Sequence, residues 1–514
     1  MRTLLTCMRL VLRLRWIYRA TGLAAVVTTA EPQSPRATPA EISRAVDSVA
    51  ARVVASGLSP GLGVAVAMDG QTIFSRAYGW ADETNRIRAD ERTLWYVAST
   101  SKSYTGFGIA LLATQGVVDL SVPIGTLLPG VAWPAGADPE RLTLAAFLSH
   151  THRLDDNAVV QSAAFTGAIA ESRWPSLIRF ARPRSDTNLV YSNFGYNVAA
   201  MVIDRTRPEG WRRFLDSAVY RPAGMTKTYA RLSGLDPRRI AKPHAFQPGG
   251  GFVTRPFEKT DATMNSAGGH VATLHDLARW TIVQMDGGRI DGKQVFPAEA
   301  VRLSHRLIAR HTAEASKRFA YFDREGWGAG WDLGSYQGEP MVSRFGGYST
   351  IRSHLSMLPG RRIGVVAQAN GPGGGAATDL IAALVYDLEA GRPNARALAS
   401  ARLDSLVALQ PAARARAAAS DSVRRSRQRP LSRPLADLAG SYEHEAFGTL
   451  TFIVQGNALR YRWGALEGAT EVFDATRDEL RFEIAGTGYV VGFRFDGPGA
   501  ARTLDLMGAT FVRR

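Results

Sequence analysis

Residues 96–107 read Tyr-Val-Ala-Ser-Thr-Ser-Lys-Ser-Tyr-Thr-Gly-Phe, which predicts an apolar strand end that runs into a helix. Ser99 lies at the junction, and the run of hydroxyl residues is typical of a helix N-terminus. On a helix, Ser99 and Lys102 are three residues apart and share one face. An amine whose pKa is lowered by burial can take the proton of a neighbouring serine and make it a nucleophile. The N–H groups at the helix start would stabilise negative charge that develops near Ser99.

The Ser-x-x-Lys spacing is not specific by itself. The chain has six lysines, and roughly half a match is expected by chance in a chain of this length. A capping serine beside a solvated lysine would explain the spacing equally well. The prediction of a catalytic pair therefore depends on patterns further along the chain.

A second polar pair precedes another predicted helix. Tyr191 and Asn193 stand two residues apart, directly before a helical pattern that runs to Val202. Both side chains can then project into a cleft, where the phenol can relay a proton and the amide can hydrogen-bond a substrate or the lysine. The alternative for Tyr191 is an ordinary core aromatic. His150, in the loop after an earlier short helix, is read as structural.

An early hairpin, a helical middle and late strands predict the fold. A helix over residues 40–57 precedes a hairpin over 61–80, and residues 341–370 predict three further strands. This order favours one antiparallel sheet closed by both ends of the chain, with an α-helical insert. The fold class is therefore α+β: an antiparallel sheet flanked by helices, plus an α-helical subdomain.

Composition divides the chain into four predicted parts. Residues 1–30 carry five arginines, no acid and a short apolar run that ends in small residues, which is typical of a signal peptide. We therefore expect an exported protein, periplasmic or extracellular; a disordered start or initiation at Met8 are the alternatives. Residues 31–391 form the predicted main domain. The Arg-, Ala- and Pro-rich residues 392–434 predict a linker, and the alternating runs of 435–514 predict a small antiparallel β-barrel.

Charge and cysteine usage exclude several classes of function. The formal net charge is +16, but most of it lies in residues 1–30 and 392–433. A nucleic-acid-binding protein would instead carry a basic face with interleaved aromatics, so no nucleic-acid partner is expected. The apolar run near the N-terminus is too short to span a bilayer, so no membrane span is expected after signal removal. Cys7 is the only cysteine, and the nine histidines show no H-E-x-x-H spacing, so neither metal nor other cofactor is expected.

Ser99-x-x-Lys102, Tyr191-x-Asn193 and the Phe345-Gly346-Gly347 strand together resemble the serine β-lactamase and penicillin-binding-protein superfamily. The likeness is closer to the class C-like group, which contains esterases and D-stereospecific peptidases. It covers about residues 40 to 390. The C-terminal barrel is similar to domains often appended to that group.

The resemblance implies a role for each residue. Ser99 would be the acylated nucleophile, Lys102 its activating base, and Tyr191 the proton relay toward the leaving group. Asn193 would position Lys102 and the substrate. The backbone N–H groups of Ser99 and of Tyr348, directly after the two glycines, would form the oxyanion hole.

One position departs from the family pattern. The third motif normally opens with Lys or His, and here Phe345 takes that place, preceded by Arg344. Arg344 is expected to point to the opposite side of an ideal strand. Arg352 is a second candidate cation, with surface placement as its alternative.

We therefore favour a carboxylesterase-like or general acyl hydrolase, acting on a small-molecule ester, amide or peptide, over an efficient β-lactamase. One alternative is a β-lactamase, a D-Ala-D-Ala-type carboxypeptidase or a D-aminopeptidase of the cell envelope. Another is a non-catalytic penicillin-binding-like protein. The sequence leaves the oligomeric state open.

Overall fold

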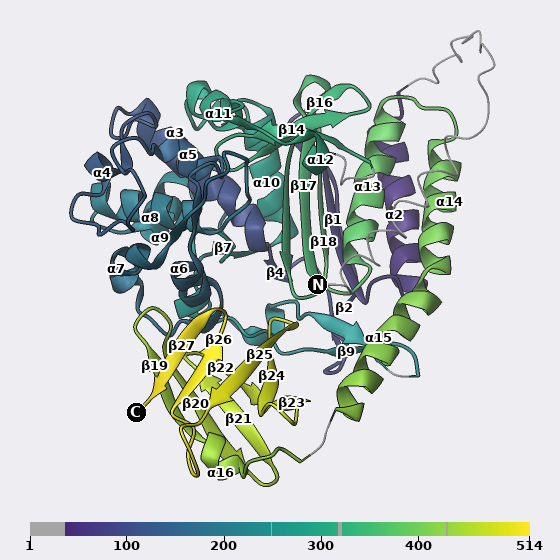
Figure 1. The fold of residues 1–514 in the computed structure, drawn as a ribbon. Coiled ribbons are helices and arrows are strands. Elements are labelled where there is room, and N and C mark those ends of the chain that lie inside the picture. The colour runs from purple at the N-terminus through teal and green to yellow at the C-terminus, as the bar shows by residue number, and fades with distance from the viewer. Residues whose placement is uncertain (1–35, 248, 317–320, 428–429) are drawn as a thin grey trace, which may run out of the picture.

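The computed structural model describes residues 36–247, 249–316, 321–427 and 430–514. Its centre is a nine-stranded antiparallel sheet in the order β13-β14-β15-β16-β17-β18-β1-β2-β3 (Figure 1). The sheet with its helices confirms the α+β fold class. The signal peptide predicted for residues 1–30 lies outside the described residues and stays a prediction.

Strands from the two ends of the main domain meet in this sheet. The predicted hairpin is formed by β1 and β2, and β18 pairs with β1 from Leu62 opposite Ala369 to Met68 opposite Ile363. The sheet is therefore closed by both chain ends, as predicted. Its strands are β1 (Gly61–Met68), β2 (Gln71–Asp82), β3 (Ile87–Arg88), β13 (Ala309–Arg310), β14 (Asp323–Trp327), β15 (Asp332–Tyr336), β16 (Glu339–Tyr348), β17 (Ile351–Leu358) and β18 (Ile363–Ala369).

Helices cover both faces of the sheet. On one face lie α2 (Pro39–Ala55), α13 (Gly374–Glu389) and α14 (Ala395–Ala408), and on the other lies α10 (Leu274–Met285) (Figure 1). All eight residues of β1 are buried because it is covered on both sides. Its alternate side chains divide between two cores, with Val64 and Val66 packing toward α2 and α13 and Ala65 toward α10. Full burial of one such valine stabilises the fold by about 1.5–3 kcal/mol.

The helical insert confirms the predicted α-helical subdomain and holds the elements that matter for the site. A short sheet of β4 (Trp95–Tyr96), β10 (Val271–Ala272) and β7 (Thr228–Tyr229) leads the chain into α3 (Ser101–Thr114). Against α3 packs α8 (Phe194–Thr206). The other helices of this part are α4 (Ile124–Leu127), α5 (Leu144–Leu148), α6 (Asn157–Gln161), α7 (Trp174–Leu177), α9 (Trp211–Leu215) and α11 (Ala298–His305), whereas α12 (Ala313–Ser316) contacts β14 of the main sheet.

Residues 392–434, which the sequence predicts as a linker, contain secondary structure that the sequence did not indicate. Most of this segment is helical, in α14 and in α15 (Gln410–Ser426). In α14 only Ala395, Ala399 and Leu403 are fully buried, with Leu406 and Val407 partly buried beside them, and α15 has no fully buried residue. Alanine and arginine are strong helix formers, and ion pairs of α15 replace the missing apolar face. Because neither helix has a continuous apolar face, the composition of the segment predicted a linker and not the two helices.

The C-terminal region is the predicted small barrel. Nine antiparallel strands follow the order β22-β21-β20-β19-β27-β26-β25-β24-β23, and β22 approaches β24 so that the sheet nearly closes. Figure 1 shows it below one end of the main sheet, with α15 passing beside it. In the described part of the chain, every helix is too short or too polar to cross a bilayer. The barrel strands are β19 (Gly440–His444), β20 (Gly448–Gln455), β21 (Ala458–Trp463), β22 (Leu466–Ala469), β23 (Glu471–Asp474), β24 (Glu479–Ile484), β25 (Thr487–Arg494), β26 (Thr503–Leu506) and β27 (Ala509–Arg513).

Candidate active site

Ser99 sits on a sharp bend between β4 and α3. The bend is a 3-10 turn over Ala98–Thr100, and Ala98 has a φ of 46°, a left-handed value that is rare for a residue with a Cβ. Such a conformation costs on the order of 1–3 kcal/mol and persists only where its surroundings hold it. Here the Val97 N–H donates to the His270 carbonyl at 3.0 Å, and Ser101 Oγ donates to the Ala98 carbonyl at 2.7 Å. The hydroxyl residues thus fix the bend by bonding carbonyl groups rather than by capping the helix.

Lys102 lies beside Ser99, as the Ser-x-x-Lys spacing predicted. Its Nζ donates to Ser99 Oγ at 3.2 Å, to Asn193 Oδ1 at 2.6 Å and to the Ala267 carbonyl at 2.8 Å. The side chain is fully buried, and this burial lowers the pKa of Lys102 to about 8. The amine can therefore lose its proton close to neutral pH and offer a lone pair to Ser99.

Tyr191 completes the contacts of the serine. Its Oη donates to Ser99 Oγ at 2.7 Å, and the Arg344 Nη2 donates to Tyr191 Oη at 2.8 Å. Burial of the hydroxyl opposes ionisation, but the positive charges of Arg344 and then Lys102 outweigh it and lower the pKa of Tyr191 to about 7. Tyr191 as a whole residue is 47% exposed, so the site opens to solvent at this residue. Lys102 and Tyr191 form a coupled pair that titrates near neutrality.

Arg344 corrects the expectation for the third motif. Besides its bond to Tyr191, its Nε donates to the Ser99 carbonyl at 2.9 Å, and its guanidinium lies 4.8 Å from the Trp327 ring. The ring of Phe345 packs instead against Phe322 and His354, at centroid distances of 6.2 and 4.8 Å. Alternation along the strand was predicted correctly, but the wrong residue was assigned to the cationic position. That position is held by Arg344.

Position 346 requires glycine because β16 approaches the backbone of residues 97–99 closely. A Cβ at this position would lie 2.2 Å from the Val97 carbonyl oxygen and 3.1 Å from the Ser99 nitrogen. Only glycine lets β16 lie directly against the nucleophile. The Tyr348 side chain, on the same face of the strand, packs edge-on against Tyr96 at 5.3 Å.

Gly347 and Arg352 lie on the opposite face of the sheet from Ser99. They are cross-strand partners, and a Cβ on Gly347 would be 3.2 Å from Arg352 Nη1. That nitrogen donates to the Ser349 and Ile351 carbonyls at 3.0 and 2.8 Å. Arg352 therefore does not take the role of a substrate-binding cation next to the serine.

The structure brings Ser99, Lys102, Tyr191 and Asn193 together, as the sequence predicted, and adds partners that the sequence did not indicate. Arg344 was set aside because Phe345 was assigned to the motif position, and alternation along an ideal strand then points Arg344 to the opposite side. The carbonyl of Ala267, which accepts from Lys102 Nζ, belongs to the run Ala267-Gly268-Gly269 and was not predicted as part of the site. His150 lies under Tyr191 with ring centroids 4.7 Å apart, and burial lowers its pKa well below the ordinary value, so it is a neutral packing residue.

A second serine also has a histidine and an aspartate in line. His354 Nδ1 lies 2.9 Å from Asp379 Oδ1, and its Nε2 lies 2.7 Å from Ser356 Oγ. Ser356 is completely buried and its hydroxyl also meets Tyr386 Oη at 2.7 Å. No substrate can reach this hydroxyl in the folded chain, so the trio stabilises the contact of β17 with α13.

Comparison with known proteins gives a family and distant relatives. A family model described as Beta-lactamase matches residues 46–388. Protein flp of Staphylococcus aureus (strain COL) is 18% identical over 334 residues, covering 63% of this chain and 62% of that protein. Penicillin-binding protein 4 of Amycolatopsis lactamdurans is 25% identical over 343 residues, covering 64% and 86%. Unguisins hydrolase ungD of Aspergillus violaceofuscus (strain CBS 115571) is 23% identical over 336 residues, covering 60% and 58%. The chain thus spans less than two thirds of the length of flp.

Solved structures share the fold at low sequence identity. The octameric penicillin-binding protein homologue from Pyrococcus abyssi superposes with a TM-score of 0.58 at 16% identity, covering 91% of this chain and 99% of that one. The D-amino acid amidase from Ochrobactrum anthropi SV3, complexed with L-phenylalanine amide, superposes with a TM-score of 0.52 at 20% identity, covering 64% and 91%. Because the first of these likenesses covers 91% of this chain, it extends into the C-terminal barrel.

Proposed function

The chain belongs to the beta-lactamase family, and from this premise we propose that it is a serine hydrolase that cleaves ester or amide bonds through an acyl-enzyme on Ser99. The amidase and hydrolase among its relatives support a hydrolase in general. One observation carries the finer proposal. Ser99 Oγ lies within hydrogen-bond distance of both Lys102 Nζ, at 3.2 Å, and Tyr191 Oη, at 2.7 Å.

In the proposed reaction, the pair of Lys102 and Tyr191 acts as the base. Both groups donate to Ser99 Oγ when protonated, so loss of a proton from either leaves an acceptor for the serine hydroxyl proton. Ser99 Oγ then attacks the substrate carbonyl, and Tyr191 passes a proton to the leaving alcohol or amine. Water attacks the acyl-enzyme with the same pair as base, which regenerates Ser99. General base catalysis of this kind contributes about 10²–10⁴ in rate.

The oxyanion hole needs a backbone donor on β16 besides the Ser99 N–H. The sequence placed it at Tyr348, three residues after the cationic position. Because Arg344 holds that position, we assign the donor to the Gly347 N–H instead. One well-placed donor contributes about 10²–10³ to the rate.

The cation at Arg344 favours a second candidate function. A guanidinium beside the nucleophile can recognise a carboxylate or a carbonyl, which the assignment of Phe345 to this place had argued against. A β-lactamase or D-amino-acid-directed peptidase of the cell envelope is therefore the alternative to an esterase-like enzyme. Both use the same acyl-enzyme on Ser99.

The test is intact-mass spectrometry together with turnover. The protein is incubated with a p-nitrophenyl short-chain ester, with a D-amino acid amide and with a penicillin, alongside Ser99→Ala and the control Ser356→Ala. The proposal expects an adduct or turnover that Ser99→Ala abolishes and Ser356→Ala retains. Rapid penicillin adducts without ester turnover would favour the peptidase or β-lactamase alternative. Absence of adduct and turnover with all three substrates would contradict a serine hydrolase.

Export stays a proposal that rests on residues 1–30 alone. A mature chain that begins after residue 30 in the periplasm or the medium would support it. An uncut chain retained in the cytoplasm would contradict it.

A further inference from the structure

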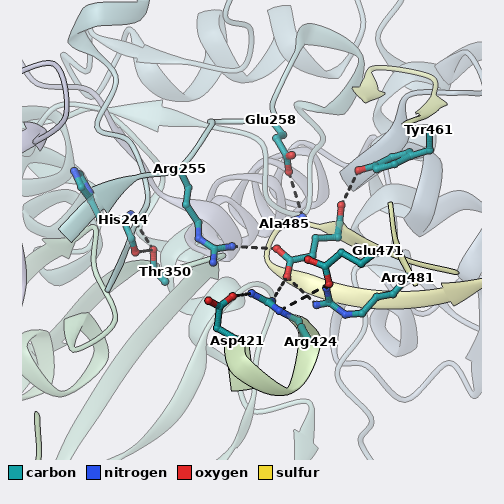
Figure 2. A network of polar contacts seen from close by, with 11 residues as sticks. His244, Arg255, Glu258, Thr350, Asp421, Arg424, Tyr461, Glu471, Arg481 and Ala485 are labelled. Carbon is teal, nitrogen blue, oxygen red and sulfur yellow. Dashed lines mark hydrogen bonds and ion pairs between the residues drawn. The ribbon is translucent and has the colours of Figure 1, made fainter. Parts of the chain in front are cut away.

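An open pocket of about 740 Å³ is lined by three parts of the chain that are distant in sequence. Its walls are the hairpin of β8 (His244–Phe246) and β9 (Phe252–Thr254), the turn between β16 and β17, helix α15, and the barrel turn of residues 485–487. Figure 2 shows this region, with Thr350, Arg255, Arg424 and Ala485 from the different walls. The main domain, the supposed linker and the barrel therefore build one pocket together.

The pocket begins close to the nucleophile. Ser349, which lines it, follows Gly346 by three residues, and Gly346 lies against the Ser99 nitrogen. Three residues of chain span at most about 10 Å. The neighbouring Thr350 ties the β8–β9 hairpin to this turn, because its Oγ1 donates to the His244 carbonyl at 2.7 Å and accepts from the His244 N–H at 3.1 Å (Figure 2).

Ion pairs hold the barrel turn over the end of β16. Glu483 accepts from Arg255 at 3.2 Å and from Arg424 of α15 at 2.8 Å. The Ala485 N–H donates to the Glu258 carboxylate at 3.3 Å (Figure 2). At Gly486 a Cβ would lie only 3.3 Å from Ser349 Oγ. The barrel therefore touches the turn that directly follows the site strand.

Charge indicates what the pocket accepts. Three arginines and one aspartate line it, but Arg255 and Arg424 are already paired with Glu483. Arg414 lies over the rings of Phe246 and Phe252 at 4.4 and 5.2 Å, and donates to the Gly251 carbonyl at 2.9 Å.

Arg414 keeps donors for a ligand. Among the described residues, no carboxylate forms a salt bridge with Arg414, although its positive charge acts on Glu83 and favours the ionised carboxylate there. A guanidinium stacked on aromatic rings with donors to spare binds a carboxylate well.

The direction of the substrate follows from Tyr191. The proposed proton relay contacts Arg344, five residues before Ser349, so the leaving group belongs at that end of the strand. The acyl part of a substrate then runs the other way, along β16 toward Ser349 and the pocket.

We propose that this pocket is the distal acyl subsite, and that it takes an extended acyl group ending in a carboxylate recognised by Arg414. This inference rests on the proposed hydrolase function. Because a residue of extended peptide spans about 3.3–3.6 Å, an acyl group of about three residues is long enough to reach the pocket. An acidic peptide, or an acyl chain of similar length with a terminal carboxylate, is the substrate class that fits.

The test uses two esters of equal length that differ at the far end. p-Nitrophenyl hydrogen sebacate carries a terminal carboxylate, whereas p-nitrophenyl decanoate ends in a methyl group, and p-nitrophenyl acetate reports the basal activity. The value of kcat/KM is measured for the wild type, Arg414→Gln and the control Arg416→Gln, which changes an exposed arginine of the same helix outside the pocket. We expect the preference for sebacate over decanoate to fall about tenfold or more in Arg414→Gln, mainly through KM, and to persist in Arg416→Gln. Acetate hydrolysis should stay the same in all three.

An unchanged preference in Arg414→Gln, with normal acetate hydrolysis, would overturn the subsite. If the wild type hydrolyses none of the esters, the proposed function fails, and the pocket is tested by calorimetry of sebacate with the Ser99→Ala protein. Binding that Arg414→Gln removes would still support the pocket. Absence of sebacate binding would overturn it.

Discussion

Replacing Arg344 by methionine removes the cation that does most to lower the pKa of Tyr191. The substitution keeps an unbranched side chain against Trp327 but deletes the hydrogen bonds to Tyr191 Oη and to the Ser99 carbonyl. One hydrogen bond to a charged group contributes about 1.5–3 kcal/mol. Since one pKa unit corresponds to about 1.4 kcal/mol, the pKa of Tyr191 should rise by about one to two units from its value of about 7.

The protonation state of the base, the pair of Lys102 and Tyr191, decides whether Arg344→Met raises or lowers the activity. Hydrolysis requires the deprotonated pair, so activity falls on the acidic side of its titration. In the wild type this fall should occur near pH 7, and in Arg344→Met it should move to about pH 8–9. At pH 7 kcat/KM should therefore drop about 5- to 50-fold, whereas the two enzymes should converge at higher pH.

The assay is a pH profile of kcat/KM for a short-chain p-nitrophenyl ester, read at a wavelength where the product absorbs equally in both ionisation states. Arg344→Lys, which keeps a positive charge, should retain more of the wild-type profile than Arg344→Met. An equal loss of activity at every pH, with no displacement of the acidic fall, would refute this reasoning. Arg344 would then act only by holding the bend at Ser99.

Three further changes test other parts of the molecule. Gly346→Ala should abolish hydrolysis and lower the Tm, because the new Cβ would lie 2.2 Å from the Val97 carbonyl oxygen; a fully active variant would contradict the close approach. Lys259→Met should raise the Tm at neutral and lower pH, because burial lowers the pKa of Lys259 to about 7 and so disfavours its charged form in the folded protein. The Tm of the wild type should therefore rise as the pH increases from about 7 to 10.5, and a plot of Tm against pH should lack this rise in the variant. Asn193→Leu should lower kcat about tenfold or more with little change in KM, because Lys102 Nζ loses the Asn193 Oδ1 acceptor at 2.6 Å. An unchanged kcat would show that Asn193 does not position Lys102 for the reaction.

The order of elements made much of the fold predictable from the sequence. Hairpin, helical insert and late strands have distinct periodicities, and β18 pairs with β1 as that order implied. Ser99 and Lys102 could be predicted as a pair because three residues on a helix fix their relative position. Tyr191 and Asn193 required the family resemblance, since no local rule brings them to Ser99.

What the sequence could not supply depends on tertiary context. The side of the sheet on which Arg344 lies depends on which residue of β16 meets Ser99, and a shift of one residue exchanges the two faces. Helix α15 was missed because it is held by ion pairs and by contact with other parts of the chain, not by an apolar face. The contact of the barrel with Ser349 has no sequence signal, because the two turns are about 140 residues apart in the chain.

The pairing of β1 with β18 also determines when the main sheet can form during synthesis of the chain. Leu62 and Ala369 are neighbours in the sheet but about 300 residues apart in the chain. Ribosomes add about 5–20 residues per second, so β1 waits about 15–60 seconds before its partner strand is made. Closing a loop of that length costs about 5 kcal/mol of chain entropy. A nascent chain that already contains Ser99, Lys102 and Tyr191 therefore has the residues of the active site but not yet the site itself.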